Sequence, residues 1–455
     1  MTGQRDATDE TDLVDADAAT VPETAATLRN GRRDVAEEVE RRLERIESVE
    51  PDVHALVAEP GRADRLRAAA AALRDRYPEP RDRPPLYGVP VGVKDIFHVD
   101  GLPTRAGSDL PVEELTGAEG SAVAALREAG AVVLGKTVTT EFAYFEPGPT
   151  RNPHDPDRTP GGSSSGSAAA VAAGETPLAL GSQTIGSVLR PASFCGVVGF
   201  KPSYGRIPMD GVLPLAASVD HVGVFTRTVA GARTAASVLC DGWDGDDAGT
   251  ADRPVLGVPE GPYLSQASAA GREQFAAQVE ALGDAGYEVR RVDPFDDVEA
   301  LNDRHNRLVA AEAALAHADW FDEYGDRYAE STADLVREGR DVSVGELADA
   351  RESRGALRDR LASAAAAEGV DLWVSPAAPG PAPEGIGDTG DPVMNLPWTH
   401  AGLPAVSLPG GRVDGLPVGL QCVAGFGADE RLLAWAGPMA AALDDAFGRR
   451  PPEQS

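Results

Sequence analysis

Hydrophobic positions follow two different periods along the chain, and the two patterns alternate from one segment to the next. Apolar residues three or four positions apart predict amphipathic helices, whereas short continuous apolar runs bounded by turn residues predict buried strands. Segments with the helical pattern are 35–46, 62–77, 121–129, 167–173, 274–282 and 431–443. Strand-like runs are 86–93, 131–134, 177–180, 255–257, 287–292, 371–374, 405–408 and 418–423. This alternation predicts an α/β fold in which helices cover a mixed sheet.

Two segments depart from this alternation. Residues 1–20 are acidic and poor in large apolar side chains, which predicts a disordered N-terminus. Residues 296–368 repeat Ala, Arg and Glu without a strand signal, and predict a mostly helical region that acts as a cap or shapes the substrate site. Because no internal repeat or linker divides the remainder, residues 21–455 are predicted to form one domain.

The formal net charge of −31 is distributed unevenly. Acidic residues recur along most of the chain, but Gly161–Phe225 holds only three acidic and three basic residues. This contrast predicts that the charge-poor segment is core and that the rest carries an acidic surface. Since salt screens the repulsion within such a surface, the composition predicts a halophilic protein. The absence of a basic patch argues against direct binding of nucleic acid.

Other sequence features narrow the class of protein. No run of 18 apolar residues is present, and the first residues lack the pattern of a signal peptide, which predicts a cytoplasmic protein without a membrane span. The three cysteines form no CxxC pair, as expected in a reducing compartment. The seven histidines show no HExxH or zinc-finger spacing, so no metal site is predicted.

Lysine is rare, with only Lys94, Lys136 and Lys201 in the chain. Arginine keeps its proton at any working pH, whereas a buried lysine can lose its proton. Lys94 ends the apolar run 86–93, where burial would lower its pKa and make it a usable base. The structural alternative is a lysine that forms an ion pair with the adjacent Asp95 or extends its amine to the surface.

A loop of Gly and Ser, 161–167, supplies candidate nucleophiles. It allows a flexible turn before a helix, and it lacks the lysine of a phosphate-binding loop. It also matches GxSxG, the nucleophile elbow of α/β-hydrolases, with Ser164 as nucleophile and His400 as a possible base. That elbow requires a preceding strand, which the proline-containing segment 153–160 cannot provide in the centre of a sheet.

A second serine follows small residues in the segment 181–191. Such residues before Ser187 would let consecutive backbone N–H groups point to one spot, as an oxyanion hole requires. The same pattern also fits a tight turn between a strand and a helix. Taken alone, this segment leaves both interpretations open.

Together, the three segments around Lys94, Ser163 and Ser187, in this order and followed by 196–202, resemble the amidase signature family. The dense part of the resemblance covers residues 86–225, and a looser part covers 371–443. The resemblance implies a single α/β domain with a large mixed sheet between helical layers, and it implies no metal or organic cofactor.

The family's catalytic groups can be carried over residue by residue. The resemblance implies that Lys94 is the buried base, that Ser163 is the serine in a cis peptide bond, and that Ser187 is the nucleophile. It also implies an oxyanion hole formed by the backbone N–H groups of Thr184, Ile185, Gly186 and Ser187. Candidate residues of the substrate pocket are Tyr144, Trp398 and His400.

The nucleophile segment departs from the usual family pattern. Gln183 stands where the family has Asp, Ile185 replaces Gly, and Arg190 lies one position later than the usual Arg. Since Ile resists positive φ, the hole must form without left-handed geometry at that position. These departures resemble a variant branch of free amidases, haloarchaeal in composition, that act without tRNA.

The sequence therefore predicts an amidase that cleaves a small carboxamide through an acyl-serine intermediate and releases ammonia or an amine. It could act as a homodimer and needs no nucleic acid or membrane. Three alternatives stay open: the glutaminase subunit of a tRNA-dependent amidotransferase, an esterase that uses Ser164, and a catalytically inactive binding protein.

Overall fold

The computed structural model describes residues 12–245 and 253–448. Within these ranges, ten strands form one sheet in the order β2-β1-β3-β5-β4-β9-β10-β8-β6-β7. The strands are β1 Pro90–Lys94, β2 Val132–Thr137, β3 Leu178–Gln183, β4 Val198–Lys201, β5 His221–Thr226, β6 Leu256–Pro259, β7 Val289–Val292, β8 Leu372–Pro376, β9 Ala405–Val413 and β10 Leu416–Val423. Parallel pairs at both ends of the sheet flank antiparallel pairs in the centre. The predicted α/β fold with a mixed sheet is confirmed.

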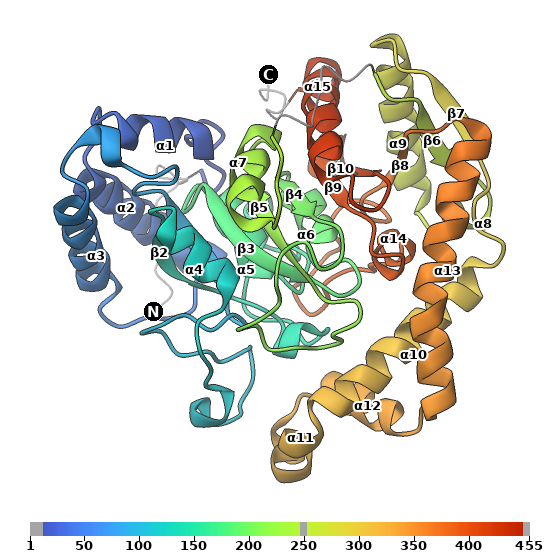
Figure 1. The fold of residues 1–455 in the computed structure, drawn as a ribbon, viewed down its shortest axis with the longest axis horizontal. Coiled ribbons are helices and arrows are strands. Elements are labelled where there is room, and N and C mark those ends of the chain that lie inside the picture. The colour runs from blue at the N-terminus through green and yellow to red at the C-terminus, as the bar shows by residue number, and fades with distance from the viewer. Residues whose placement is uncertain (1–11, 246–252, 449–455) are drawn as a thin grey trace, which may run out of the picture.

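Helices surround this sheet. They are α1 Val21–Arg29, α2 Val35–Val53, α3 Arg62–Arg76, α4 Ser121–Glu128, α5 Ser165–Ala172, α6 Leu189–Phe194, α7 Val229–Leu239, α8 Pro262–Ser265, α9 Ala269–Asp284, α10 Val298–Ala316, α11 Ala318–Tyr324, α12 Glu330–Arg340, α13 Val344–Glu368, α14 Leu396–His400 and α15 Asp429–Phe447. Figure 1 shows α1–α3 at one end of the molecule and α10–α13 at the other, with the sheet between them. In the described ranges, no helix combines the length and the apolar character needed to cross a bilayer.

Strands β1 and β3 pair in parallel and are buried along their whole length. A strand buried on both faces needs apolar or small side chains at every position, which explains the continuous runs in the sequence. Helix α5 packs against these strands and is also buried on all sides, because its side chains are small. Gly166 permits this packing, since a Cβ there would lie 2.1 Å from the carbonyl oxygen of Ala55.

Helices α10–α13, which we call the helical layer, form the region that the sequence predicts as helical. Helix α13 begins at a capping box formed by Ser343 and Glu346, and it ends at Gly369, whose φ is 60°. Helix α10 packs against α12, α13 and α14. The layer thereby lies over the part of the fold that contains the nucleophile segment, because α14 and that segment are hydrogen-bonded to each other.

The predicted disordered segment 1–20 lies partly outside the described residues, which begin at Asp12. In its described part, the carbonyl groups of Asp12 and Leu13 accept hydrogen bonds from Arg45 of α2. Helix α1 then begins at Val21 with a capping box from Thr20 and Glu23.

Candidate active site

Lys94 is the last residue of β1 and is completely buried. Its Nζ lies 2.7 Å from Ser163 Oγ and 2.8 Å from Ser182 Oγ. Burial lowers the pKa of Lys94 well below its usual value, and the negative charge of Asp220 offsets part of this lowering. A neutral amine has one lone pair and two N–H groups, so Lys94 can accept a proton from Ser163 while it donates to Ser182.

The ion-pair explanation for Lys94 is wrong, because Asp95 faces a different lysine. The carboxylate of Asp95 pairs with Lys136 of β2, with Nζ and Oδ1 2.8 Å apart. Lys201 donates to the carbonyl oxygens of Leu403 at 2.6 Å and Pro202 at 3.2 Å. Of the three lysines, only Lys94 is hydrogen-bonded to a serine hydroxyl. Lys136 donates to the hydroxyl of Thr104, and Lys201 donates to backbone carbonyl groups.

Ser163 lies in the loop that leads into α5, and the Gly162–Ser163 peptide bond is cis, as the resemblance predicts. The buried guanidinium of Arg190 donates to the carbonyl oxygen of Gly162 at 2.8 Å and to Thr389 Oγ1 at 3.2 Å. Since Arg190 belongs to α6, directly after Ser187, it connects the nucleophile segment to the loop that contains Ser163.

The segment 184–187 has four consecutive backbone N–H groups. Among the residues that the structure describes, no acceptor is bonded to the N–H of Thr184, Ile185, Gly186 or Ser187. The carbonyl oxygen of Ile185 accepts from Thr399 Oγ1 at 2.7 Å, and that of Gly186 accepts from the N–H of Arg190 at 3.0 Å. Because the two groups of a trans peptide point in opposite directions, these bonds fix the N–H groups of Gly186 and Ser187. Consecutive backbone donors without a protein acceptor are what an oxyanion hole requires.

Gln183, which departs from the family pattern, has a defined role in this segment. Its Oε1 accepts from the N–H groups of Val188 at 2.8 Å and Leu189 at 3.0 Å, at the start of α6. Its Nε2 donates to Thr399 Oγ1 at 2.9 Å. An aspartate could accept the first two bonds but could not donate the third. Gln183 thereby holds Thr399 against the carbonyl of Ile185, and the φ of Ile185 is not positive.

Two hollows share Tyr144, Phe145, Ile185 and Pro392 in their lining, and we call them together the cavity. Its inner part, which Ser187 lines, encloses about 10 Å³; the other residues there are mostly apolar, including Tyr144, Phe145, Ile185 and Leu215, together with Thr184 and Arg190. Charged and amide side chains from α10 and α12 line the larger hollow of about 610 Å³, which we call the mouth, namely Asn302, Asp303, Asn306, Arg307 and Glu338. The predicted pocket residue Tyr144 therefore lies on the cavity wall, beside the predicted nucleophile.

Comparisons with known proteins agree with this geometry. The family model described as Amidase matches residues 37–433. The chain belongs to the amidase signature family. It is 35% identical to a component of the glutamyl-tRNA(Gln) amidotransferase of Synechococcus sp. (strain RCC307), over 89% of this chain and 93% of the relative.

Solved amidase structures have the same fold. A crystal structure of an amidase superposes with a TM-score of 0.83 at 35% identity, and it covers 93% of this chain and 99% of its own. The native peptide amidase of Stenotrophomonas maltophilia superposes with a TM-score of 0.80 at 26% identity, over 96% of this chain and 99% of its own. The protein is thus an amidase-type hydrolase in fold and family.

The two other predicted pocket residues of the amidase lie elsewhere. Trp398 is completely buried between Tyr263, Phe295 and Trp373, and its Nε1 donates to the hydroxyl of Tyr263 at 2.8 Å. His400 is also buried, and its Nδ1 lies 3.1 Å from Nδ1 of His305. Both side chains pack within the fold rather than on the cavity wall described above.

The esterase alternative has no support in the geometry of the amidase. Ser164 Oγ donates to the carbonyl oxygen of Ser182 at 3.2 Å, whereas His400 Nε2 faces Ser353 Oγ at 2.8 Å. The residues before Ser164 form a loop, so the strand required for a nucleophile elbow is missing there. Ser164 and His400 do not form a nucleophile–base pair.

Sequence reasoning missed Asp220, which supports the oxyanion segment from the other side. Its Oδ1 accepts from the hydroxyl of Thr184 at 2.6 Å, and its Oδ2 accepts from the N–H groups of Leu215 and Ala216. Burial raises the pKa of this carboxyl despite these bonds. Asp220 is one of three acidic residues in the charge-poor segment, and that rarity is the signal that could have identified it.

Proposed function

We propose that the protein is a free amidase that hydrolyses uncharged carboxamides through an acyl-enzyme on Ser187. The observation that carries the proposal is the buried amine of Lys94, 2.7 Å from Ser163 Oγ. Burial favours the neutral amine, and a neutral amine bonded to a hydroxyl is the arrangement that general-base catalysis needs.

In the proposed mechanism, Ser187 Oγ attacks the amide carbonyl, while its proton passes through Ser163 Oγ to Lys94 Nζ. The oxyanion that forms is held by the N–H groups of Ile185, Gly186 and Ser187, with Thr184 as the predicted fourth donor. The C–N bond then breaks, and the leaving nitrogen takes the proton from Lys94 through Ser163. Water attacks the acyl-serine, returns one proton along the same route, and releases the carboxylic acid.

The cavity supports an uncharged substrate with an apolar group. Most side chains of its inner part are apolar, and each of its two arginines already donates to at least one protein acceptor. Arg190 donates to Gly162, and Arg307 Nη2 lies 2.7 Å from Glu346 Oε1. A glutaminase must bind the α-carboxylate of glutamine, and the two terminal nitrogens of Arg190, which a bidentate contact would use, are already bonded within the protein, whereas its Nε has no partner among the described residues. We further propose that the helical layer shapes this cavity as a cap.

A second candidate is the glutaminase subunit of a tRNA-dependent amidotransferase. This candidate is favoured because relatives that match almost the whole chain are amidotransferase components. One of them is from the glutamyl-tRNA(Gln) amidotransferase of Oleidesulfovibrio alaskensis, which is 34% identical over 96% of this chain. Such a protein would hydrolyse glutamine, whereas a free amidase would release ammonia from simple amides without any added protein.

The test is ammonia release by the purified chain in molar KCl, measured with phenylacetamide, benzamide, acetamide and glutamine. We expect hydrolysis of the aromatic amides and little hydrolysis of glutamine. Ser187→Ala should lower kcat by at least about 10⁴-fold, as expected when a serine nucleophile is lost, and it should abolish labelling by a fluorophosphonate. Ser164→Ala is the matched control and should keep most of the activity.

Three results would contradict the proposal. Hydrolysis of glutamine alone would favour the glutaminase of an amidotransferase. Loss of activity in Ser164→Ala with retention in Ser187→Ala would favour the esterase. No hydrolysis of any amide, together with no labelling of Ser187, would favour a binding protein.

A further inference from the structure

We propose that His305 is a positioning residue that aims the Ile185 N–H into the oxyanion hole by holding the carbonyl group of Thr184. The inference rests on the proposed function, since it assigns a task within the same site. His305 comes from α10 in the helical layer and lies 121 residues from the segment that it contacts.

The contact completes a regular pattern along the oxyanion segment. His305 Nε2 lies 3.2 Å from the carbonyl oxygen of Thr184. The next two carbonyl oxygens, those of Ile185 and Gly186, accept from Thr399 and from the N–H of Arg190. Each of the three carbonyl groups in succession therefore has its own donor. Since the N–H of a trans peptide points away from the carbonyl of the same peptide, the Thr184 carbonyl determines where the Ile185 N–H points.

The hydrogen-bond partners determine which nitrogen of His305 carries the proton. A carbonyl oxygen can only accept, so Nε2 must donate to Thr184. In a neutral ring, Nδ1 of His305 then accepts, and the facing Nδ1 of His400, 3.1 Å away, must donate. His400 Nε2 is left as an acceptor and faces Ser353 Oγ at 2.8 Å, and the carbonyl oxygen of Ala350 lies at the same distance from that hydroxyl. The direction from Ser353 through both rings to Thr184 gives every ring nitrogen a partner of the opposite role, and it requires the single Ser353 hydroxyl proton to point to His400 instead of to the carbonyl oxygen of Ala350.

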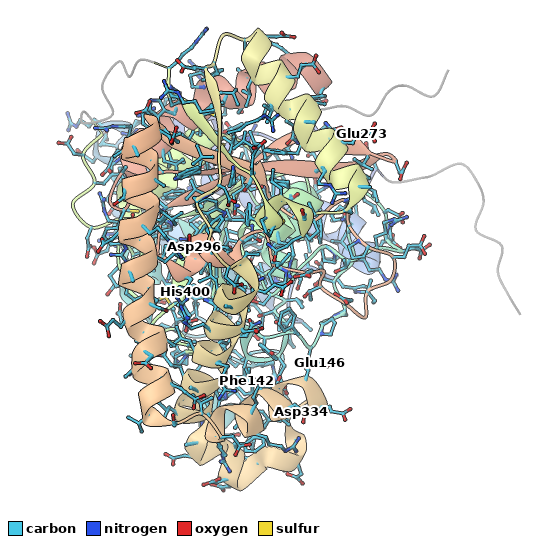
Figure 2. The ribbon with its side chains drawn as sticks, turned by 90° about the vertical axis from the view of Figure 1, so that its right-hand side faces the viewer. Phe142, Glu146, Glu273, Asp296, Asp334 and His400 are labelled. Atoms are coloured by element: carbon cyan, nitrogen blue, oxygen red, sulfur yellow. The ribbon has the colours of Figure 1, made fainter. Side chains whose placement is uncertain are left out.

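The surroundings keep both rings neutral. His305 and His400 are completely buried, and burial lowers the pKa of His305 to about 3 and that of His400 to about 2. Figure 2 shows His400 beside the ribbons of α10 and α13, which contribute His305 and Ser353. Three helices, α10, α13 and α14, therefore meet at these side chains, and the oxyanion segment is anchored to all of them.

The alternative is a buried histidine that only fills space. That role predicts a loss of stability when the ring is replaced, but no selective loss of transition-state stabilisation. A misdirected oxyanion donor has a different signature, because the hole binds the developing charge more strongly than the ground-state carbonyl. The rate should fall while KM changes little.

The test compares three variants by the rate at which a fluorophosphonate labels Ser187 and by kcat and KM on an amide substrate. His305→Leu removes the donor and should slow both labelling and kcat by at least about tenfold, less than the 10²–10³-fold typical for a donor that is lost completely. His305→Gln keeps a donor for Thr184 and an acceptor for His400, and should stay within about threefold of the wild-type rate, since both bonds survive. His317→Leu is the control, because His317 is equally buried but its Nδ1 faces the Tyr328 hydroxyl.

A second measurement needs no variant to be active. The ¹⁵N shifts of the wild-type histidines, assigned with His305→Gln, should place the proton of His305 on Nε2. A proton on Nδ1, or a folded His305→Leu protein that is labelled at the wild-type rate, would overturn the inference alone. Wild-type protein that is not labelled at Ser187 would instead overturn the proposed function, and this inference with it.

Discussion

The segment Gly161–Phe225 and the helical layer differ sharply in their charge. The segment holds six charged residues, whereas α10–α13, residues 298–368, hold 16 acidic and nine basic residues. The first contains α5, α6 and the central strands β3–β5, nearly all of it buried. The second exposes most of its charged side chains to solvent and places several of them at the mouth of the cavity.

This difference in charge lets the two regions serve two functions of one active site, which are base catalysis and substrate selection. Low dielectric surroundings shift the pKa of a lysine enough to make it a base, which an exposed helix could not do. Charged and amide groups at a cavity mouth can instead select a substrate without disturbing that chemistry. The two regions meet at few polar contacts, such as His305 with Thr184 and Glu312 with the N–H of Ser218 at 2.7 Å. We therefore expect changes in the segment to alter kcat, and changes at the cavity mouth to alter KM.

Among the changes that test this comparison between the two regions, Lys94→Arg has the largest expected effect. Arginine keeps the positive charge and approximate size of a protonated lysine but cannot accept a proton at working pH. We expect kcat to fall by at least about 10²-fold, the low end for loss of a general base. In the wild type, the rate should also fall as the pH drops through the lowered pKa of Lys94, because the protonated amine is no longer a base. The pH profile of kcat, measured by ammonia release for the wild type and for Lys94→Arg, tests both the lower kcat of the variant and the loss of wild-type rate at low pH.

Lys136→Arg is the matched control for this experiment. Lys136 is also buried, but its partner is the carboxylate of Asp95 rather than a serine. The control should stay active and keep the acidic limb of the pH profile. A folded Lys94→Arg enzyme within a few-fold of the wild-type kcat would contradict the mechanism.

The acidic surface should make the two regions respond differently to salt. Repulsion between exposed acids is screened at high ionic strength, so we expect the melting temperature to be at least about 5 °C higher in 2 M KCl than in 0.1 M KCl. Amide hydrogen exchange in dilute buffer should show α10–α13 losing protection before β3 and α5. Sucrose in place of KCl controls for a general solute effect. An equal or higher melting temperature in dilute buffer would refute the halophilic interpretation.

Local sequence pattern predicted the outer parts of the fold well. Strands such as β1 and β8 are continuous apolar runs, and α2 and α9 have clear helical periodicity. Strands β4 and β5 were not predicted, because Gly199 and Gly223 interrupt their short apolar runs. The short helix α6 was also missed, since Pro191 lies inside it.

The residues of the candidate site could be predicted only where a short stretch of sequence carries the signal. Motif resemblance led to Lys94, Ser163 and Ser187, and the cavity contains Tyr144 as expected. The supporting contacts join residues far apart in sequence, as Thr399 and Ile185 are, separated by 214 positions. No spacing pattern in a sequence predicts a contact between residues so far apart. Trp398 was predicted as a candidate pocket residue, but aromatic residues far from it in the sequence enclose it.

The smallest expected effect is that of Asn306→Ala, and it sharpens the comparison most directly. Asn306 lies on α10, one residue after His305, but its side chain is exposed at the cavity mouth. A hydrogen bond to the substrate there would act equally in the ground state and the transition state, so its loss should raise KM by about three- to tenfold, the equivalent of roughly 1 kcal/mol, without changing kcat. Glu299→Ala, an exposed change in the first turn of the same helix, is the control and should leave both constants unchanged. If Asn306→Ala instead lowered kcat at constant KM, the exposed face of the helical layer would take part in the chemical step. The assignment of kcat to the charge-poor segment and of KM to the cavity mouth would then be wrong.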